Sequence, residues 1–156
     1  MSRTQPSRSA MNEETKKYIL EKFGRMHPVF EHMDKYSPEI VEGFIKIRKA
    51  TLPPKGVDCA IPEKYKELII TAVEVATGRG EKGRSHARKA IRLGASPREV
   101  QEAVSLCIWL AGWATWVDGG SEAVKAAEDE EQKVKKGEDF HWTADIKGEK
   151  SINKFG

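Results

Sequence analysis

The apolar residues of this chain recur at helical spacing along most of its length. The clearest segment lies between Pro62 and Gly78, where apolar side chains stand three and four positions apart: Tyr65, Leu68, Ile69, Ala72, Val73 and Ala76. Further helices are predicted over residues 11–24, 38–50, 83–93, 96–118 and 121–136. No segment indicates a β-hairpin, so the pattern predicts an all-α fold.

Proline, serine and glycine mark where the predicted helices begin and end. Ser37 and Pro38 supply an N-cap and a first helical residue, and Gly94 suits the position after a helix C-terminus. The preceding stretch, MHPVFEHMDKYSPE, is expected to be broken by Pro28 and Pro38. The helix of residues 83–93 is expected to place Ala87, Ala90 and Ile91 on one side.

The helix that starts at Ser96 is predicted to be buried on two sides. Ser96, Pro97 and Glu99 together form a capping-box start signal. One apolar stripe consists of Val100, Val104, Cys107, Ala111 and Ala114, and the opposite stripe consists of Trp109, Trp113 and Trp116. A helix that is apolar nearly all round is buried on both sides. We therefore expect its second side to meet another subunit or a ligand pocket.

The length of 156 residues predicts one compact domain. Residues 1–11 are expected to form a disordered arm, residues 12–136 a single helical domain, and residues 137–156 an irregular tail. Charged residues make up 33% of the chain, but the net charge is only +3 and the two signs are interleaved. This balance argues against a nucleic-acid partner.

The expected cellular location and the expected absence of a cofactor are inferred from features that the sequence lacks. No apolar run approaches the roughly 18 residues of a membrane span, and the N-terminus has no secretory signal pattern, so we expect a cytoplasmic protein without a membrane partner. Cys59 and Cys107 form no CxxC motif and no metal-ligand spacing. We expect two reduced thiols, no metal site and no cofactor.

The glycine-rich stretch TGRGEKGRSHARKA, residues 77–90, allows two interpretations. Gly78 to Ser85 differs by one residue from the phosphate-binding pattern G-x-x-x-x-G-K-[ST], because Arg84 stands where that loop has lysine. A phosphate loop must follow a buried strand, and the segment before it has helical periodicity instead. We therefore favour a turn between two helices.

If residues 77–90 contain a turn between two helices, Glu67 and His86 become the candidate functional residues. Glu67 and Thr71 lie roughly opposite the predicted core stripe of the first helix, and His86 lies near the start of the second. Both side chains stand at the margins of their core faces, where a pocket between helices or subunits could form. A histidine titrates near neutrality, and a carboxylate can orient it.

The segment KELIITAVEVATGRGEKGRSHARKAIRLGASPREVQEAV, residues 66–104, resembles the core of the carboxymuconolactone decarboxylase and alkylhydroperoxidase D-like family. The features that carry the resemblance are the KELI opening, a histidine leading the next helix 19 residues after Glu67, and the GASPREV turn. The resemblance covers about residues 37–118. It implies an alkylhydroperoxidase D-like helical bundle that assembles into homotrimers or homohexamers.

The same resemblance separates two kinds of chemistry. The peroxidase branch of the family uses a CxxC pair shortly before the histidine, and here Arg79 and Lys82 occupy those two positions. Disulfide chemistry needs an attacking and a resolving thiol, so that activity is not inferred. The decarboxylase branch lacks the cysteines and keeps the glutamate and histidine, as this chain does.

The resulting hypothesis is a cofactor-independent lyase or proton-transfer enzyme acting on a small carboxylated, lactone-type substrate. His86 would donate the proton to carbon, or donate a hydrogen bond to the developing oxyanion, and Glu67 would orient His86 or share its proton. Substrate contacts are expected from a larger set: Arg79, Lys82 and Arg84 for a carboxylate, and Trp109, Trp113 and Trp116 for the pocket wall. A non-catalytic oligomeric scaffold of the same fold is the alternative, and a thiol-dependent reductase using Cys107 or Cys59 is a third interpretation.

Overall fold

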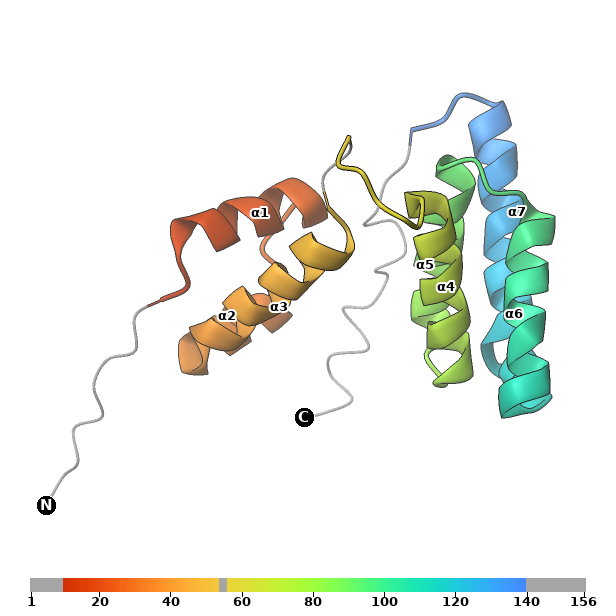
Figure 1. Ribbon diagram of the computed structural model, residues 1–156, viewed down its shortest axis with the longest axis horizontal. Helices are drawn as coiled ribbons and strands as arrows, with labels where there is room; N and C mark the ends of the chain where they lie inside the picture. The colour runs from red at the N-terminus through yellow and green to blue at the C-terminus, as the bar shows by residue number, and fades with distance from the viewer. Residues whose placement is uncertain (1–9, 54–55, 140–156) are drawn as a thin grey trace, which may run out of the picture. The chain divides into compact units, whose positions relative to one another are not determined.

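The computed structural model describes residues 10–53 and 56–139 of the chain. Within these ranges the chain forms helices and no strand, which confirms the all-α prediction (Figure 1). The α-helices are α1 (Glu13–Phe23), α2 (Pro28–Tyr36), α3 (Pro38–Thr51), α4 (Glu63–Ala76), α5 (Gly80–Arg92), α6 (Pro97–Ala111) and α7 (Ser121–Lys135). A π-helical turn, η1 (Trp116–Gly120), leads directly into α7. None of these helices combines the length and apolar composition that crossing a membrane requires.

The chain divides into two compact units, Met1–Val57 and Asp58–Gly156. The sequence predicts one helical domain over residues 12–136, and the boundary between the two units falls within that span. Each unit has its own core, and the connection between them runs through the proline- and glycine-containing segment that follows α3. The expected arm and the expected tail lie almost entirely outside the described residues, although Met11 is buried.

The first unit contains α1, α2 and α3, with α3 packing against both of the others. Its core consists of Met11, Ile19, Val41 and Ile45, with Phe23 and Phe30 packed against them. The helix α2 differs from the expectation that Pro28 breaks the pattern. Pro28 is instead the first helical residue, and the ring of His27 caps the helix by accepting the N–H of Val29. Proline is tolerated there because its missing N–H would have no intrahelical partner.

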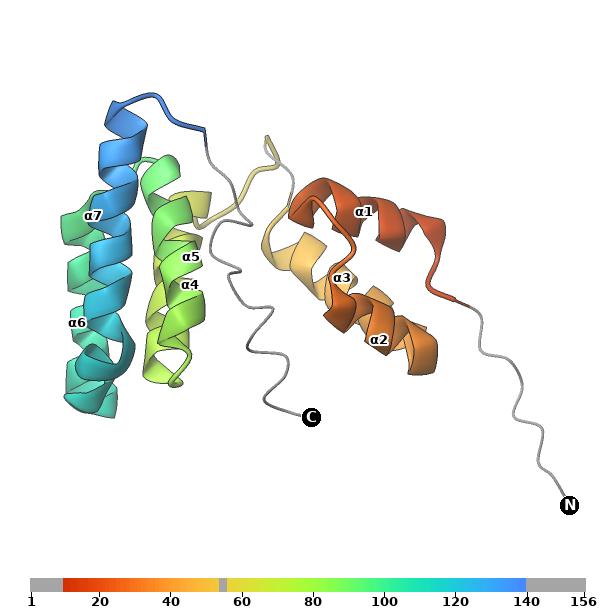
Figure 2. The same ribbon diagram turned by 180° about the vertical axis from the view of Figure 1, so that it is seen from behind.

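The second unit is a bundle of α4, α5, α6 and α7, which lie side by side with roughly parallel axes in both views (Figure 1, Figure 2). The helices α4 and α7 each pack against both α5 and α6. The core between them contains Leu68, Val75, Ala87, Ala90, Ile91, Val100, Val104, Cys107, Ala123 and Ala127. The predicted apolar face of α5 is therefore confirmed, as are the capping box at Ser96 and the place of Gly94 just after the C-terminus of α5, where its φ is 91°.

The helix α4 buries only part of the face that its apolar pattern predicts: Leu68 and Ala72 lie at the core, but other residues of the stripe do not. Its buried residues are Glu67, Leu68, Thr71 and Val75, whereas Tyr65, Ile69 and Val73 of the predicted core stripe are exposed. This helix carries apolar residues on two sides, so periodicity alone cannot choose between them. Packing against α5 and α6 decides the face, and the partners that α5 supplies make the buried carboxylate acceptable.

Two helix ends also differ from the prediction. The helix α5 begins at Gly80 rather than Gly83, and a Cβ on Gly80 would overlap the backbone of Gly119, so only glycine allows this close approach. The helix α6 ends at Ala111, because Gly112 adopts a φ of 92° that a right-handed helix cannot continue. Trp113 and Trp116 therefore do not extend the stripe of Trp109 along one helix.

Candidate functional site

The α4–α5 hairpin places Glu67 opposite His86 and Lys89. A short turn, which contains Gly78 at a φ of 73°, joins the two helices and reverses the chain. Glu67 lies about as far before this turn as Lys89 lies after it, so the two side chains meet at the same height of the hairpin. His86 is one helical turn before Lys89 and therefore shares its face of α5.

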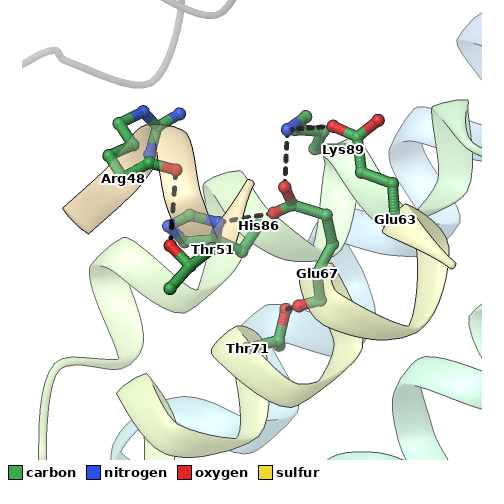
Figure 3. Close-up of polar contacts among 7 residues, drawn as sticks. All are labelled: Arg48, Thr51, Glu63, Glu67, Thr71, His86 and Lys89. Carbon is green, nitrogen blue, oxygen red and sulfur yellow. Dashed lines mark hydrogen bonds and ion pairs between the residues drawn. The ribbon is translucent and has the colours of Figure 1, made fainter. Parts of the chain in front are cut away.

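The carboxylate of Glu67 bonds to both α5 residues at once (Figure 3). One carboxylate oxygen, Oε2, lies 2.7 Å from Nδ1 of His86, and the other, Oε1, lies 2.5 Å from Nζ of Lys89. The Glu67 side chain is 0% exposed, whereas that of His86 is 17% exposed. The histidine is thus held from the inside by a buried carboxylate.

The charges of this site follow from competing effects on each pKa. Burial raises the pKa of the Glu67 carboxyl, but the hydrogen bonds from His86 and Lys89 and their charges lower it by more, so the pKa lies below its ordinary value. Burial likewise lowers the pKa of the Lys89 ammonium, and its contacts with Glu67 and Glu63 more than reverse this effect, so that pKa is raised. At neutral pH the site therefore contains a carboxylate and an ammonium group.

Two further residues extend the site along α4. Oε1 of Glu63 lies 2.9 Å from Nζ of Lys89, so the ammonium bridges two carboxylates one helical turn apart. The hydroxyl of Thr71, which is fully buried, donates to the backbone carbonyl of Glu67 at 2.8 Å. Glu63 and Lys89 were not among the residues predicted for the site. Glu63 is four residues before Glu67 on α4, and Lys89 is three residues after His86 on α5, so each shares a helix face with a predicted residue.

Two of the three basic residues predicted to bind a substrate carboxylate, Arg79 and Arg84, contact acidic residues of the protein itself. Arg79 forms an ion pair with Glu74, with Nε 2.7 Å from Oε2. Arg84 reaches the start of α7, where Nη1 lies 3.3 Å from Oε2 of Glu122. Lys82 is exposed in the first turn of α5. The contacts of Arg79 and Arg84 are thus with residues other than the Glu67–His86 pair.

The three tryptophans predicted as a pocket wall occupy different environments. Trp116 is half-buried and packs against the core of the second unit, with its ring over Gly120. Trp109 is 83% exposed on α6, and Trp113 is also exposed. The helix α6 packs against α4 and barely touches α5, so these rings do not share the α5 face that carries His86.

The two thiols are free. Cys107 is buried and its Sγ donates to the carbonyl of Ala72 at 3.2 Å. Burial raises the pKa of the Cys107 thiol, which disfavours the reactive thiolate. Among the described residues, no three His, Cys, Asp or Glu side chains are arranged to hold a metal ion.

Comparison with known proteins supports the family that the hairpin sequence resembles. The family model "Carboxymuconolactone decarboxylase family" matches residues 38–129. A search of curated proteins finds no significant match. The crystal structure of a candidate carboxymuconolactone decarboxylase from Burkholderia xenovorans LB400 has the same fold, with a TM-score of 0.69 and 22% sequence identity, over 81% of this chain and 96% of that one. Since the family model spans more than half of the sequence, the chain belongs to the carboxymuconolactone decarboxylase family.

Proposed function

We propose that this protein is a cofactor-independent carboxy-lyase, or a related proton-transfer enzyme, that acts on a small carboxylated substrate of the lactone type. The observation that carries the proposal is the buried Glu67 carboxylate bonded to Nδ1 of His86. A histidine oriented by a carboxylate is suited to act as a general acid or base. The carboxylate holds one ring nitrogen, so the other ring nitrogen exchanges the proton. Membership of the family makes decarboxylation the first reaction to test.

The chemistry requires one proton donor near the reacting carbon. When the bond between the carbon and the carboxylate breaks, CO2 leaves and the electron pair remains on the substrate, delocalised into the lactone carbonyl. A proton must then reach the carbon, and protonated His86 would deliver it from Nε2, the ring nitrogen that Glu67 does not engage. Water would restore the proton to the ring. Glu67 would hold the ring through Nδ1 in both states.

The proposed contacts of a substrate carboxylate lie near the start of α5. A substrate carboxylate requires a cation, and the candidates near the start of α5 are Arg79, Lys82 and Arg84. Arg79 and Arg84 already pair with Glu74 and Glu122, so a substrate anion would have to compete with these contacts. Trp109, Trp113 and Trp116 would contribute to substrate binding only through an assembly that brings α6 near the α5 face of another copy.

The proposal also includes assembly of several copies of the chain. Such an assembly is expected for the enzyme and equally for the alternative, a non-catalytic scaffold. The exposed apolar side chains Tyr65, Ile69 and Val73 of α4 and Leu106, Trp109 and Leu110 of α6 lie on two helices that pack against each other. Residues 103–117 contain no charged side chain. Exposed apolar side chains gathered on two packed helices are typical of an interface between copies of one chain, and a homotrimer or homohexamer is the expected assembly.

The interface is tested by Trp109→Glu, which places a charge on the most exposed ring of this surface. Sedimentation velocity is expected to show an assembly for the wild type and smaller species for the variant. His32→Glu, on an exposed residue of α2, is the matched control. An unchanged sedimentation coefficient in Trp109→Glu would remove this surface from the proposal.

The lyase activity is tested by incubating the protein with carboxymuconolactone and a panel of related carboxylated lactones while CO2 release is measured. We expect turnover by the wild type and a loss of roughly 10²–10⁴-fold in kcat for His86→Ala, the range that general acid–base catalysis contributes. His32→Ala, which removes a histidine outside the site, should keep the wild-type rate. Equal inactivity of the wild type and His86→Ala on the whole panel would leave the scaffold as the better proposal.

A further inference from the structure

The Glu67 carboxylate has a separate partner on each oxygen, and only one of those partners is the histidine. Oε2 faces Nδ1 of His86 at 2.7 Å, whereas Oε1 faces Nζ of Lys89 at 2.5 Å. Lys89 is itself held by Glu63 at 2.9 Å. Figure 3 shows these residues as a continuous chain that runs from Glu63 through Lys89 and Glu67 to His86.

We propose that Lys89 is a positioning residue, which aims the Glu67 carboxylate at His86 and keeps it ionised when the histidine has given up its proton. The proposal rests on the proposed function, because it assigns Lys89 a part in the same proton transfer. Lys89 acts through Glu67 and is not placed against the substrate.

The need for such a residue follows from the proton transfer itself. While His86 is protonated, the buried carboxylate faces a positive charge. After the proton has left, the ring is neutral, and a fully buried carboxylate with no other partner would be unfavourable. It would then tend to take up a proton and stop accepting from Nδ1–H. The ammonium of Lys89 supplies a charge that does not change during this cycle.

The second bond also restricts the geometry of the carboxylate. A carboxylate with one donor can rotate about its terminal bond and present either oxygen. With Oε1 held by Lys89, rotation would break an ion pair, so Oε2 stays directed at His86. Lys89 is in turn restrained by two carboxylates, those of Glu63 and Glu67.

Lys89 contributes as a cation rather than as a nucleophilic amine. Its pKa is raised, since the contacts with Glu67 and Glu63 outweigh the opposing effect of burial. The ionisable groups that face Glu67 from both helices are His86 and Lys89 of α5, with Glu63 reaching the cluster through Lys89. Of these, Lys89 is the group whose charge can be removed without changing the proton donor.

The proposal is tested by following the ¹³C signal of the Glu67 carboxyl carbon through a pH titration, with the signal assigned by its loss in Glu67→Gln. In Lys89→Met we expect the midpoint of this titration to rise by roughly one to three pH units, because an opposite charge at this distance lowers a carboxyl pKa by that amount. Lys89→Arg, which keeps the charge, should stay near the wild type. An unmoved midpoint in Lys89→Met would overturn the proposal.

A matched control distinguishes this effect from the loss of any partly buried lysine. Lys64, also paired to a glutamate at 2.9 Å, is 23% exposed where Lys89 is 22% exposed, but its partner is Glu99. Lys64→Met should leave the Glu67 midpoint unchanged, and an equal rise in both variants would count against a specific role of Lys89. If Lys89→Met does not fold, Lys89→Gln decides the question, because an amide retains a donor and removes the charge; its midpoint should also rise.

Activity separates this proposal from the proposed function. If the wild type is active, the acid limb of the kcat–pH profile of Lys89→Met should shift to higher pH, by about as much as the midpoint of the Glu67 titration. A profile that stays in place while the midpoint moves would overturn the catalytic part of the proposal. If the wild type is inactive on every lactone, the proposed function fails, and the titration still shows whether Lys89 controls the charge of Glu67.

Discussion

Two buried carboxylates contact α5, one from α4 and one from α7, and they differ in the partners that α5 offers. Glu67 of α4 meets His86 and Lys89, whereas Glu130 of α7 meets Arg92, with Oε1 2.5 Å from its Nε. Both carboxylates are almost completely buried. Burial and an ion pair are therefore insufficient to mark a functional site in this protein.

The chemical character of the partner separates the two regions. Arginine remains protonated at any pH at which a protein folds, so the Glu130–Arg92 pair cannot exchange a proton and serves to fasten α5 to α7. An imidazole gains and loses its proton near neutral pH. The Glu67 side of α5 can thus do proton chemistry, and the Glu130 side supplies the reference for what a purely structural pair does.

The largest expected effect on stability comes from breaking the structural pair. Glu130→Gln removes the charge that Arg92 faces in a nearly buried position, and the free energy of unfolding should fall by roughly 3–5 kcal/mol. Urea unfolding monitored by circular dichroism measures this loss. The folded variant should keep the wild-type kcat, and a fall in kcat without loss of structure would remove the distinction between the two carboxylates.

The same substitution at the candidate site, Glu67→Gln, should reduce activity more and stability less than Glu130→Gln does. Glu67→Gln is expected to lower kcat by about 10²-fold, the lower end of the contribution of acid–base catalysis. Its free energy of unfolding should fall by less than that of Glu130→Gln, because Lys89 retains Glu63 and the imidazole can lose its charge. Urea unfolding and kinetic measurements on the two variants test this. Equal losses of stability and unchanged kcat in both variants would mean that both pairs are structural.

A pH series sharpens the comparison with a smaller effect. Since the pKa of Glu67 is lowered from its ordinary 4.5, the ionised carboxylate contributes stability above about pH 4.5, and this contribution is lost as the pH falls through the lower folded-state value. Between about pH 6 and about pH 3, the wild type should therefore lose more stability than Glu67→Gln. Urea midpoints across this interval provide the measurement, and parallel slopes for the two proteins would contradict it.

The smallest expected effect comes from the thiols. Cys107→Ala removes a buried sulfur and should cost about 1 kcal/mol of stability, and Cys59→Ala should cost less because that residue is only half-buried. Neither change should alter kcat, since burial raises the pKa of the Cys107 thiol. Loss of turnover in the double variant would revive the thiol-dependent interpretation and place reactive chemistry outside the Glu67–His86 pair.

Local signals in the sequence were sufficient for three features of the second unit. The capping box at Ser96, the place of Gly94 after the end of α5 and the buried face of α5 depend on neighbouring residues along one helix, so the sequence predicted them correctly. The family was also recognisable from the hairpin segment, and the family model confirms it. The start of α2 was missed because Pro28 is compatible with a break and with a first helical turn alike.

Contacts between helices decided what periodicity could not. The helix α4 has apolar residues on two sides, and its packing against α5 and α6 buries Glu67 and Thr71 while it exposes Ile69 and Val73. No pattern within α4 indicates this choice, because the residues that make a buried carboxylate favourable belong to α5.

The sequence by itself determined an all-helical chain, the helix ends at Ser96 and Gly94, and the residue types Glu67 and His86 at a spacing typical of the family. The tertiary structure alone decided that Glu67 is fully buried and that Lys89 and Glu63 complete its surroundings. The physical reason is that helix ends depend on hydrogen bonds within a few residues, whereas the charge of a buried group depends on partners brought from another helix.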